Sequence, residues 1–190
     1  MSHHAKFVLA LATSATMAAA QDPFYAVAQA SGGGGVVLFR PGSSNSLSPY
    51  GSSFTGGVRV AVGDVNGDGI DDLITGAGPG GSAHVKVFSD GNGAELKSFF
   101  AFDGFSGGVN VAAGDVNGDG KADIIVGAGA GSSPTVRVFD GNTGSVLSSF
   151  LAFDAGFTGG VSVAAGDVNG DGIPDIVTST GPGGRSEEHT

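Results

Sequence analysis

The sequence contains no cysteine, and only eight of its 190 residues are lysine or arginine. Without cysteine, neither a disulfide nor a thiolate metal site can stabilise the fold. The basic residues are scattered, with no cluster and no interleaved aromatic residues, which argues against a nucleic acid or an anionic membrane as partner. No apolar stretch is long enough to predict a transmembrane segment.

The sequence also lacks any convincing amphipathic helix pattern. Apolar residues alternate with a period of two instead, as at Val58, Val60 and Val62, which is typical of a half-buried β-strand. The 37 glycines fall at recurring turn positions between β-branched runs, so they indicate turns rather than disorder. An all-β fold is therefore predicted.

One seven-residue string, GDVNGDG, occurs three times, starting at Gly63, Gly114 and Gly166, at intervals of 51 and 52 residues. The flanking sequence repeats as well, since FTGGVRVAVGDVNGDG returns as FSGGVNVAAGDVNGDG and FTGGVSVAAGDVNGDG, and HVKVF returns as TVRVF. A fixed period of this size predicts a repeat architecture. In the first repeat, four short strands are predicted at residues 58–62, 73–76, 85–88 and 96–102.

Four short strands in about fifty residues are typical of one blade of a β-propeller. The GAGPGG-like segments and recurring phenylalanines around a DxNxDGxxD loop resemble FG-GAP repeats, the blades of integrin alpha-subunit propellers and of many bacterial secreted proteins. The resemblance covers roughly residues 25–184. It implies an all-β propeller, or an arc of one, because the chain holds fewer blades than the roughly four to eight of a closed propeller.

The chain divides by this pattern into six segments. Val36 to Phe39 align with Val85 to Phe88, so the segment before Phe54 is interpreted as a blade without its first strand and without an acidic loop. The segments are 1–20, a signal peptide; 21–53, a partial blade; 54–104 and 105–156, full blades; 157–184, a partial blade; and 185–190, a tail.

Both ends of the chain carry specific predictions. The apolar stretch from Phe7 to Ala12 and the small-residue site ending at Ala20 predict a secretory signal, against a disordered alanine-rich N-terminus, and hence a secreted, extracellular protein. The final string RSEEHT matches the translation of a common sequencing adapter. It is interpreted as an artefactual end, the alternative being a natural polar tail.

The three acidic loops predict calcium sites, because they place oxygen ligands at alternate positions and Gly69 permits the sharp turn. Magnesium prefers strict octahedral geometry, and zinc prefers nitrogen or sulfur ligands. The calcium is expected to be structural, with modest affinity. The predicted ligands, with Ile70, Lys121 and Ile173 contributing carbonyl oxygens, are Asp64, Asn66, Asp68, Ile70 and Asp72; Asp115, Asn117, Asp119, Lys121 and Asp123; and Asp167, Asn169, Asp171, Ile173 and Asp175.

Several other interpretations of these strings are weaker. An EF-hand or dockerin loop needs an acidic ligand at position twelve, where this chain has Thr75, Val126 and Thr178. The GxGxxG match at residues 76–81 leads into a strand rather than a helix, and the GxSxG match at residues 104–108 has threonine in the other repeats. The recurring phenylalanines are assigned to packing rather than to a sugar platform.

The predicted function is a secreted calcium-binding propeller module for protein or carbohydrate binding and adhesion, without catalytic residues. By the resemblance, such propellers present loops on one face to their partners, while the calcium loops lie on the other. The alternative is a fragment of a calcium-dependent extracellular hydrolase or lyase whose catalytic part is missing. An open blade edge is also expected to permit edge-to-edge self-association.

Overall fold

The computed structural model describes residues 7–11, 25–29, 31–40, 43–89 and 93–182. In these residues every regular element is a β-strand, and all paired strands are antiparallel. The first two sheets, each in sequence order, consist of β1 (Phe7–Leu11), β2 (Tyr25–Gln29), β3 (Val36–Arg40) and β4 (Ser43–Leu47), and of β5 (Val58–Gly63), β6 (Asp72–Ala77), β7 (His84–Phe88) and β8 (Glu95–Phe100).

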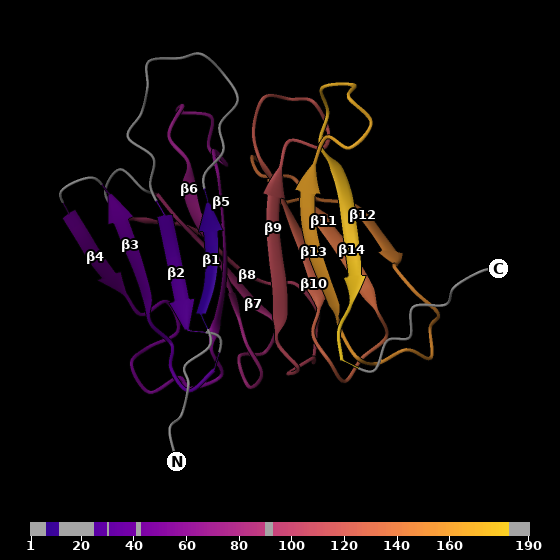
Figure 1. Cartoon of the computed structure of the whole chain (residues 1–190), viewed down its shortest axis with the longest axis horizontal. Coiled ribbons are helices and arrows are strands. Elements are labelled where there is room, and N and C mark those ends of the chain that lie inside the picture. The colour runs from indigo at the N-terminus through magenta and orange to yellow at the C-terminus, as the bar shows by residue number, and fades with distance from the viewer. Residues whose placement is uncertain (1–6, 12–24, 30, 41–42, 90–92, 183–190) are drawn as a thin grey trace.

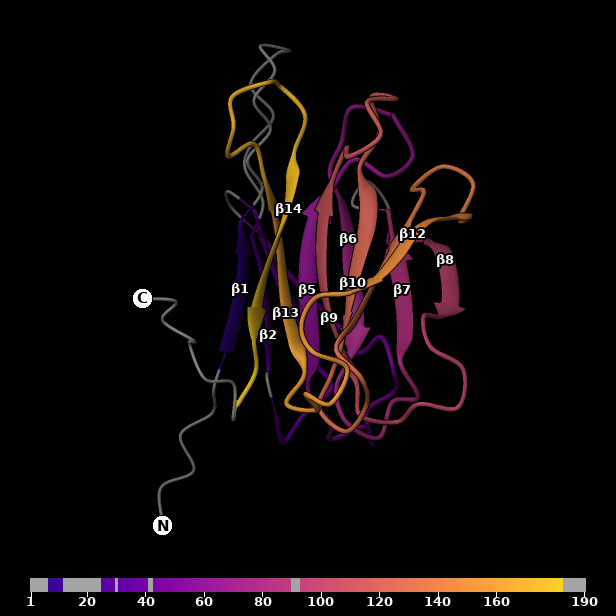
Figure 2. The same ribbon diagram turned by 90° about the vertical axis from the view of Figure 1, so that its right-hand side faces the viewer.

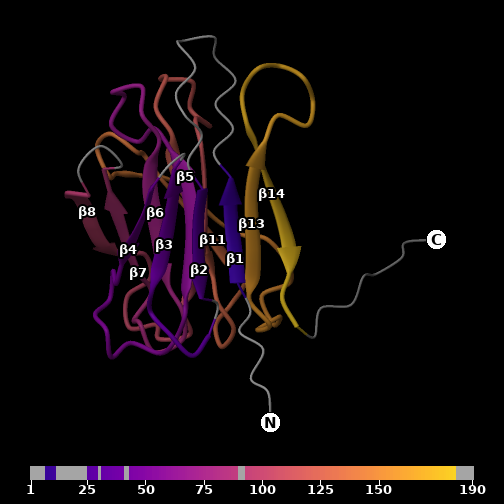
Figure 3. The same cartoon turned by 60° about the vertical axis from the view of Figure 1, so that its left-hand side comes forward.

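The third sheet repeats the second, and the fourth contains two described strands. Their strands are β9 (Val109–Gly114), β10 (Asp123–Ala128), β11 (Thr135–Phe139) and β12 (Val146–Leu151), followed by β13 (Val161–Gly166) and β14 (Asp175–Thr180). The first strands β1, β5, β9 and β13 lie next to one another along the inside of the assembly (Figure 1). The sheets are propeller blades arranged in an arc that is not closed, and β14 lies at one end of it (Figure 3).

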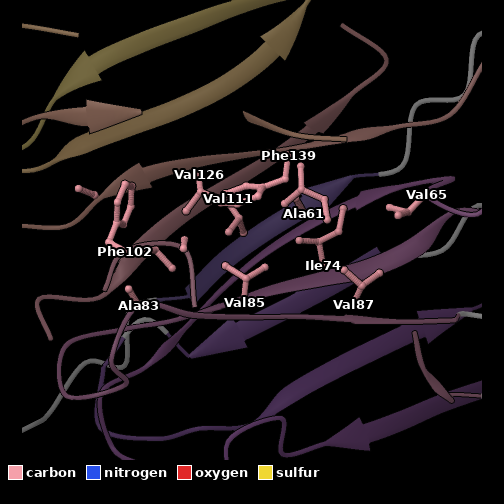
Figure 4. Close-up of a cluster of buried hydrophobic side chains, with 14 residues drawn as sticks. Ala61, Val65, Ile74, Ala83, Val85, Val87, Phe102, Val111, Val126 and Phe139 are labelled. Carbon is pink, nitrogen blue, oxygen red and sulfur yellow. The ribbon is translucent and has the colours of Figure 1, made fainter. Parts of the chain in front are cut away.

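The second strand of each full blade is buried on both faces, because a neighbouring sheet covers each side. All six residues of β6 and all six of β10 are buried, which is more burial than the predicted half-buried strands would have. Between the second and third sheets, Ile74, Val85 and Val87 face Val126 and Phe139 (Figure 4). Blade-to-blade packing therefore supplies the hydrophobic core.

The recurring phenylalanines belong to this packing, as predicted. Phe88 and Phe139 are buried, and the rings of Phe99 and Phe139 lie 4.7 Å apart, centroid to centroid. Phe102 is buried too, but it lies beyond β8, which ends at Phe100 rather than at residue 102. Phe150, equivalent to Phe99, is 38% exposed, because the described part of the fourth sheet has no strand to cover it.

The first sheet corrects one prediction from the sequence. The sequence predicts a first blade that lacks its first strand, but the structure contains this strand as β1. It pairs antiparallel with β2, with Phe7 opposite Gln29 and Leu11 opposite Tyr25. The reason is that the residues FVLAL, assigned to the apolar stretch of a leader, are equally suited to a β-strand. The predicted cleavage site at Ala20 and the RSEEHT tail lie outside the described residues, so the signal peptide and the artefactual end stay predictions.

Candidate metal centres

Each acidic loop connects the first strand of a sheet to the second, as the sequence predicts. The loops follow β5, β9 and β13, and all three lie at the same end of the molecule (Figure 2). Strands rather than helices flank every loop, and position twelve of the first loop, Thr75, is a buried residue of β6. This excludes an EF-hand for the three loops.

The first loop is organised around the carboxylate of Asp64. Its Oδ1 accepts hydrogen bonds from the backbone nitrogens of Gly67 (2.6 Å) and Asp68 (3.1 Å), and its Oδ2 accepts one from Gly69 (2.8 Å). Asn66 Oδ1 also accepts from the Asp68 nitrogen at 2.8 Å. Gly67 and Gly69 have φ values of 79° and 84°, in the left-handed region that glycine adopts without strain.

The same arrangement recurs in the other two loops. Asp115 accepts from the nitrogens of the residues three, four and five positions further on at 2.7, 3.0 and 2.8 Å, and Asp167 does so at 2.6, 3.2 and 2.9 Å. These backbone hydrogen bonds hold the pKa of Asp167 below its usual value. The sequence repeat is therefore a repeat of one loop conformation.

The last acidic residue of the first loop, Asp72, is fully buried at the start of β6. Its Oδ2 accepts a hydrogen bond from the backbone nitrogen of Val65 at 3.1 Å, whereas its Oδ1 has no hydrogen-bond partner in the described part of the chain. Burial raises the pKa of Asp72 to about 6, and the nearby charges of Asp68 and Asp64 act in the same direction. A buried carboxylate oxygen without a partner is costly.

In the second loop the equivalent residue, Asp123, is also fully buried but better satisfied. Its Oδ2 accepts from the Val116 nitrogen at 3.1 Å, and its Oδ1 accepts from Gly141 at 3.1 Å and from Asn117 Nδ2 at 3.4 Å. Burial raises its pKa as well. In the third loop, Asp175 Oδ2 accepts a hydrogen bond from the backbone nitrogen of Val168, and Asp175 Oδ1 accepts one from Asn169 Nδ2 at 3.4 Å.

Neighbouring loops are in direct contact across the seams between sheets. The backbone nitrogen of Ala122 donates a 2.7 Å hydrogen bond to the backbone oxygen of Asp64, and Gly67 lies against the side chain of Lys121. The loop valine shows the consequence, because Val65, covered by the next sheet, is 1% exposed, while Val168, with no described sheet beyond it, is 74% exposed. The first and second loops therefore help to join two blades.

The chemistry of these loops suits a hard cation, since the predicted ligand positions of each one offer three carboxylates and one amide. Among the described residues, however, no three acidic or histidine side chains are already gathered so as to hold an ion. In the first loop the oxygens of Asp64 are directed at backbone amides instead. Oδ1 accepts two such bonds, but Oδ2 accepts only one, so Oδ2 keeps a second lone pair for a cation.

The carbonyl ligands predicted at Ile70, Lys121 and Ile173 stay predictions. Lys121 uses its ammonium group to contact Asn142 Oδ1 at 2.8 Å, in the β11–β12 turn of the same sheet.

Comparison with known proteins identifies the repeats. Residues 64–126 match the FG-GAP-like repeat, and residues 107–147 and 159–188 match the FG-GAP repeat. The chain is an FG-GAP repeat protein. These matches include the three acidic loops and the strands that follow them, which agrees with the resemblance inferred from the sequence.

This FG-GAP protein is similar to integrin alpha chains. It is 31% identical to integrin alpha-V of Gallus gallus over 150 residues, which cover 69% of this chain, and 31% identical to integrin alpha-7 of Mus musculus over 170 residues, which cover 77%. The matched part spans 14% of the length of either relative. No helix in the described residues is long and apolar enough to cross a membrane.

Proposed function

We propose that the chain is an extracellular binding or adhesion module in which each acidic loop binds one structural calcium ion. The observation that carries the calcium sites is the buried carboxylate of Asp72, whose unpartnered Oδ1 lies in the field of Asp64 and Asp68. A divalent cation would satisfy that oxygen and offset the repulsion between the three carboxylates. Calcium fits better than magnesium, because it accepts an irregular shell of many oxygens.

The structural role follows from where the loops lie. The 2.7 Å hydrogen bond from Ala122 to the Asp64 oxygen connects the first loop to the second, so an ion that orders the first loop also orders the seam between two sheets. The proposal assigns the described residues to architecture and binding, and none of them to catalysis. The proposed partner is a protein or a glycan.

The test of the calcium sites is thermal unfolding of the whole chain, followed by circular dichroism in calcium and in chelator. Chelation should lower the melting temperature, since an ion that binds only the folded state stabilises it by mass action. In D68A the shift should shrink by about a third, because one of three sites is lost. D103N, which removes an exposed carboxylate at the opposite end of the sheet, should retain the full shift. An identical melting temperature in calcium and chelator would overturn the proposal.

A further inference from the structure

A cluster of aromatic rings lies at the end of the second sheet opposite to the acidic loops. The His84 ring lies between those of Phe100 and Tyr50, with centroids 4.6 and 5.5 Å away, and Tyr50 lies 5.5 Å from Phe54. His84 and Phe100 are directly opposite in the β7–β8 register, so their side chains share one face of the sheet. The rings come from three separate segments of the chain.

The phenyl ring of Phe100 lies between two hollows and is 57% exposed. One hollow, of about 560 Å³, is lined by Tyr50, Phe54, His84 and Lys86, and the other, of about 310 Å³, by Phe102, Asp103 and Phe105. Phe100 and Ser82 line both hollows. An exposed aromatic ring flanked by two concavities is a surface on which a flat apolar face can be placed.

The next sheet shows that the fold does not require this surface. Its residues equivalent to His84 and Phe100 are Thr135 and Leu151, so the aromatic pair is absent. There Arg137 crosses the seam, with its guanidinium carbon 5.3 Å from the centre of the Phe102 ring and a 2.8 Å hydrogen bond to the backbone oxygen of Ala101. In the second sheet the corresponding residue, Lys86, forms an ion pair with Glu95 instead, with 2.7 Å between Nζ and Oε2.

Some of the polar groups around Phe100 form hydrogen bonds with other described residues, and others do not. The hydroxyl of Tyr50 donates to backbone oxygens of Thr75 (2.9 Å) and His84 (3.0 Å), which fixes its ring in place. In the described part of the chain, the exposed Ser82 hydroxyl and Asp103 carboxylate make no such side-chain contact. They therefore remain available to a ligand at the two hollows.

The backbone that carries Ser82 is strained. Ser82 and Ala83 have φ values of 55° and 54°, and they are the non-glycine residues with positive φ among the described residues. The left-handed region is unfavourable for such residues and, where it persists, often marks a functional site. The equivalent turn of the third sheet has no such residue in it. The residue with this left-handed backbone conformation, Ser82, lies beside the aromatic cluster.

We propose that this surface binds a neutral hexopyranose unit of a glycan, with the C–H face of the sugar ring stacked on Phe100. Hydroxyl groups of the sugar then hydrogen-bond to Ser82, Asp103 and Lys86, which line the hollows. A sugar ring combines one apolar face with a polar edge, as this surface combines an aromatic centre with a polar rim. The glycan is neutral because the chain carries a net charge of -10, which disfavours a polyanion. This inference rests on the proposed function, and names the ligand and its site.

The test uses two-dimensional NMR of the whole chain with β-1,4-linked hexaoses of glucose, galactose and N-acetylglucosamine. One of these should shift the resonances of Ser82, Phe100 and Asp103. F100A should weaken binding at least tenfold, and F100L, which introduces the residue of the next repeat, should weaken it as well. F150A, at an exposed phenylalanine on another sheet, should bind normally.

Several outcomes would overturn the glycan site. These are the absence of shifts with all three hexaoses, equal binding by F100A and the unchanged chain, or stronger shifts with a proline-rich peptide, the alternative ligand of an aromatic groove. Melting in calcium and chelator is recorded on the same samples. If chelation still lowers the melting temperature while no hexaose binds, the glycan site fails and the calcium proposal stands. If a hexaose binds but chelation does not change the melting temperature, the calcium proposal fails and the glycan site stands.

Discussion

Ala122 and Asp64 join two propeller blades through a 2.7 Å hydrogen bond between their backbones. The bond lies between neighbouring acidic loops, so the most polar part of the repeat is also part of the blade interface. This explains why equivalent residues of the three loops differ in burial although their sequences are nearly identical. The position of a loop in the arc determines how much of it the next blade covers.

The loop valines give a matched test of this interface. Replacing Val65, which is 1% exposed, by alanine should cost about 2 kcal/mol of unfolding free energy, because it leaves a cavity between two sheets. The same change at Val168, 74% exposed, should stay within about 0.5 kcal/mol. Urea unfolding in calcium measures both. Equal effects of the two substitutions would contradict the packing described for the seam.

The glycines that precede the acidic loops give a second matched pair. A Cβ added at Gly63 would lie 2.8 Å from the Cβ of Ala122 and 3.0 Å from that of Ala113, whereas one added at Gly166 would meet nothing within 4 Å. We expect G63A to destabilise the fold by about 1–3 kcal/mol through overpacking, and G166A to be close to neutral. The readout is the urea midpoint. A tolerated G63A would show that the sheets are less closely apposed than in this structure.

Tyr50 anchors the connection before the second sheet. Its hydroxyl donates to backbone oxygens of Thr75 and His84, and burial raises the pKa of this phenol well above its usual value. Replacing Tyr50 by phenylalanine should therefore cost about 1–3 kcal/mol, since buried backbone oxygens lose a donor. The control is Ser148→Ala, which removes an exposed hydroxyl and should leave the stability nearly unchanged. A neutral Y50F would mean that water replaces the hydroxyl.

The pH dependence of His84 has a definite sign. Burial and then the charge of Lys86 lower its pKa, so the folded state favours the neutral ring. The unfolded chain, with a histidine pKa of about 6.5, takes up the proton first, so this contribution to stability is complete above pH 6.5 and is lost as the pH falls below it. Proton NMR should give His84 a lower pKa than the unfolded chain. A value above 6.5 would contradict the structure.

The repeat made most of this fold predictable. The pattern around Val58, Val60 and Val62 located the strands, and three copies of GDVNGDG located the loops. The first strand could not be assigned, because the stretch from Phe7 to Leu11 has a composition that suits both a leader and a strand. The complete burial of β6 also depends on sheets that lie on both of its sides, which local periodicity does not reveal.

The aromatic surface could not be predicted for a related reason. Tyr50, His84 and Phe100 come from distant segments, and only the structure brings them together. Neither His84 nor Phe100 has an aromatic counterpart in the next repeat, so a search for repeated residues passes over both. The recurring phenylalanines, which the repeat does identify, are mainly those buried between blades.

The central claim is that each acidic loop holds one calcium ion, and equilibrium dialysis of the whole chain against labelled calcium tests it most directly. We predict three ions per chain, with dissociation constants on the order of 0.1–1 mM, as for other extracellular modules. D68A should bind two. No calcium uptake at several millimolar free calcium, or uptake that D68A, D119A and D171A leave unchanged, would contradict the account.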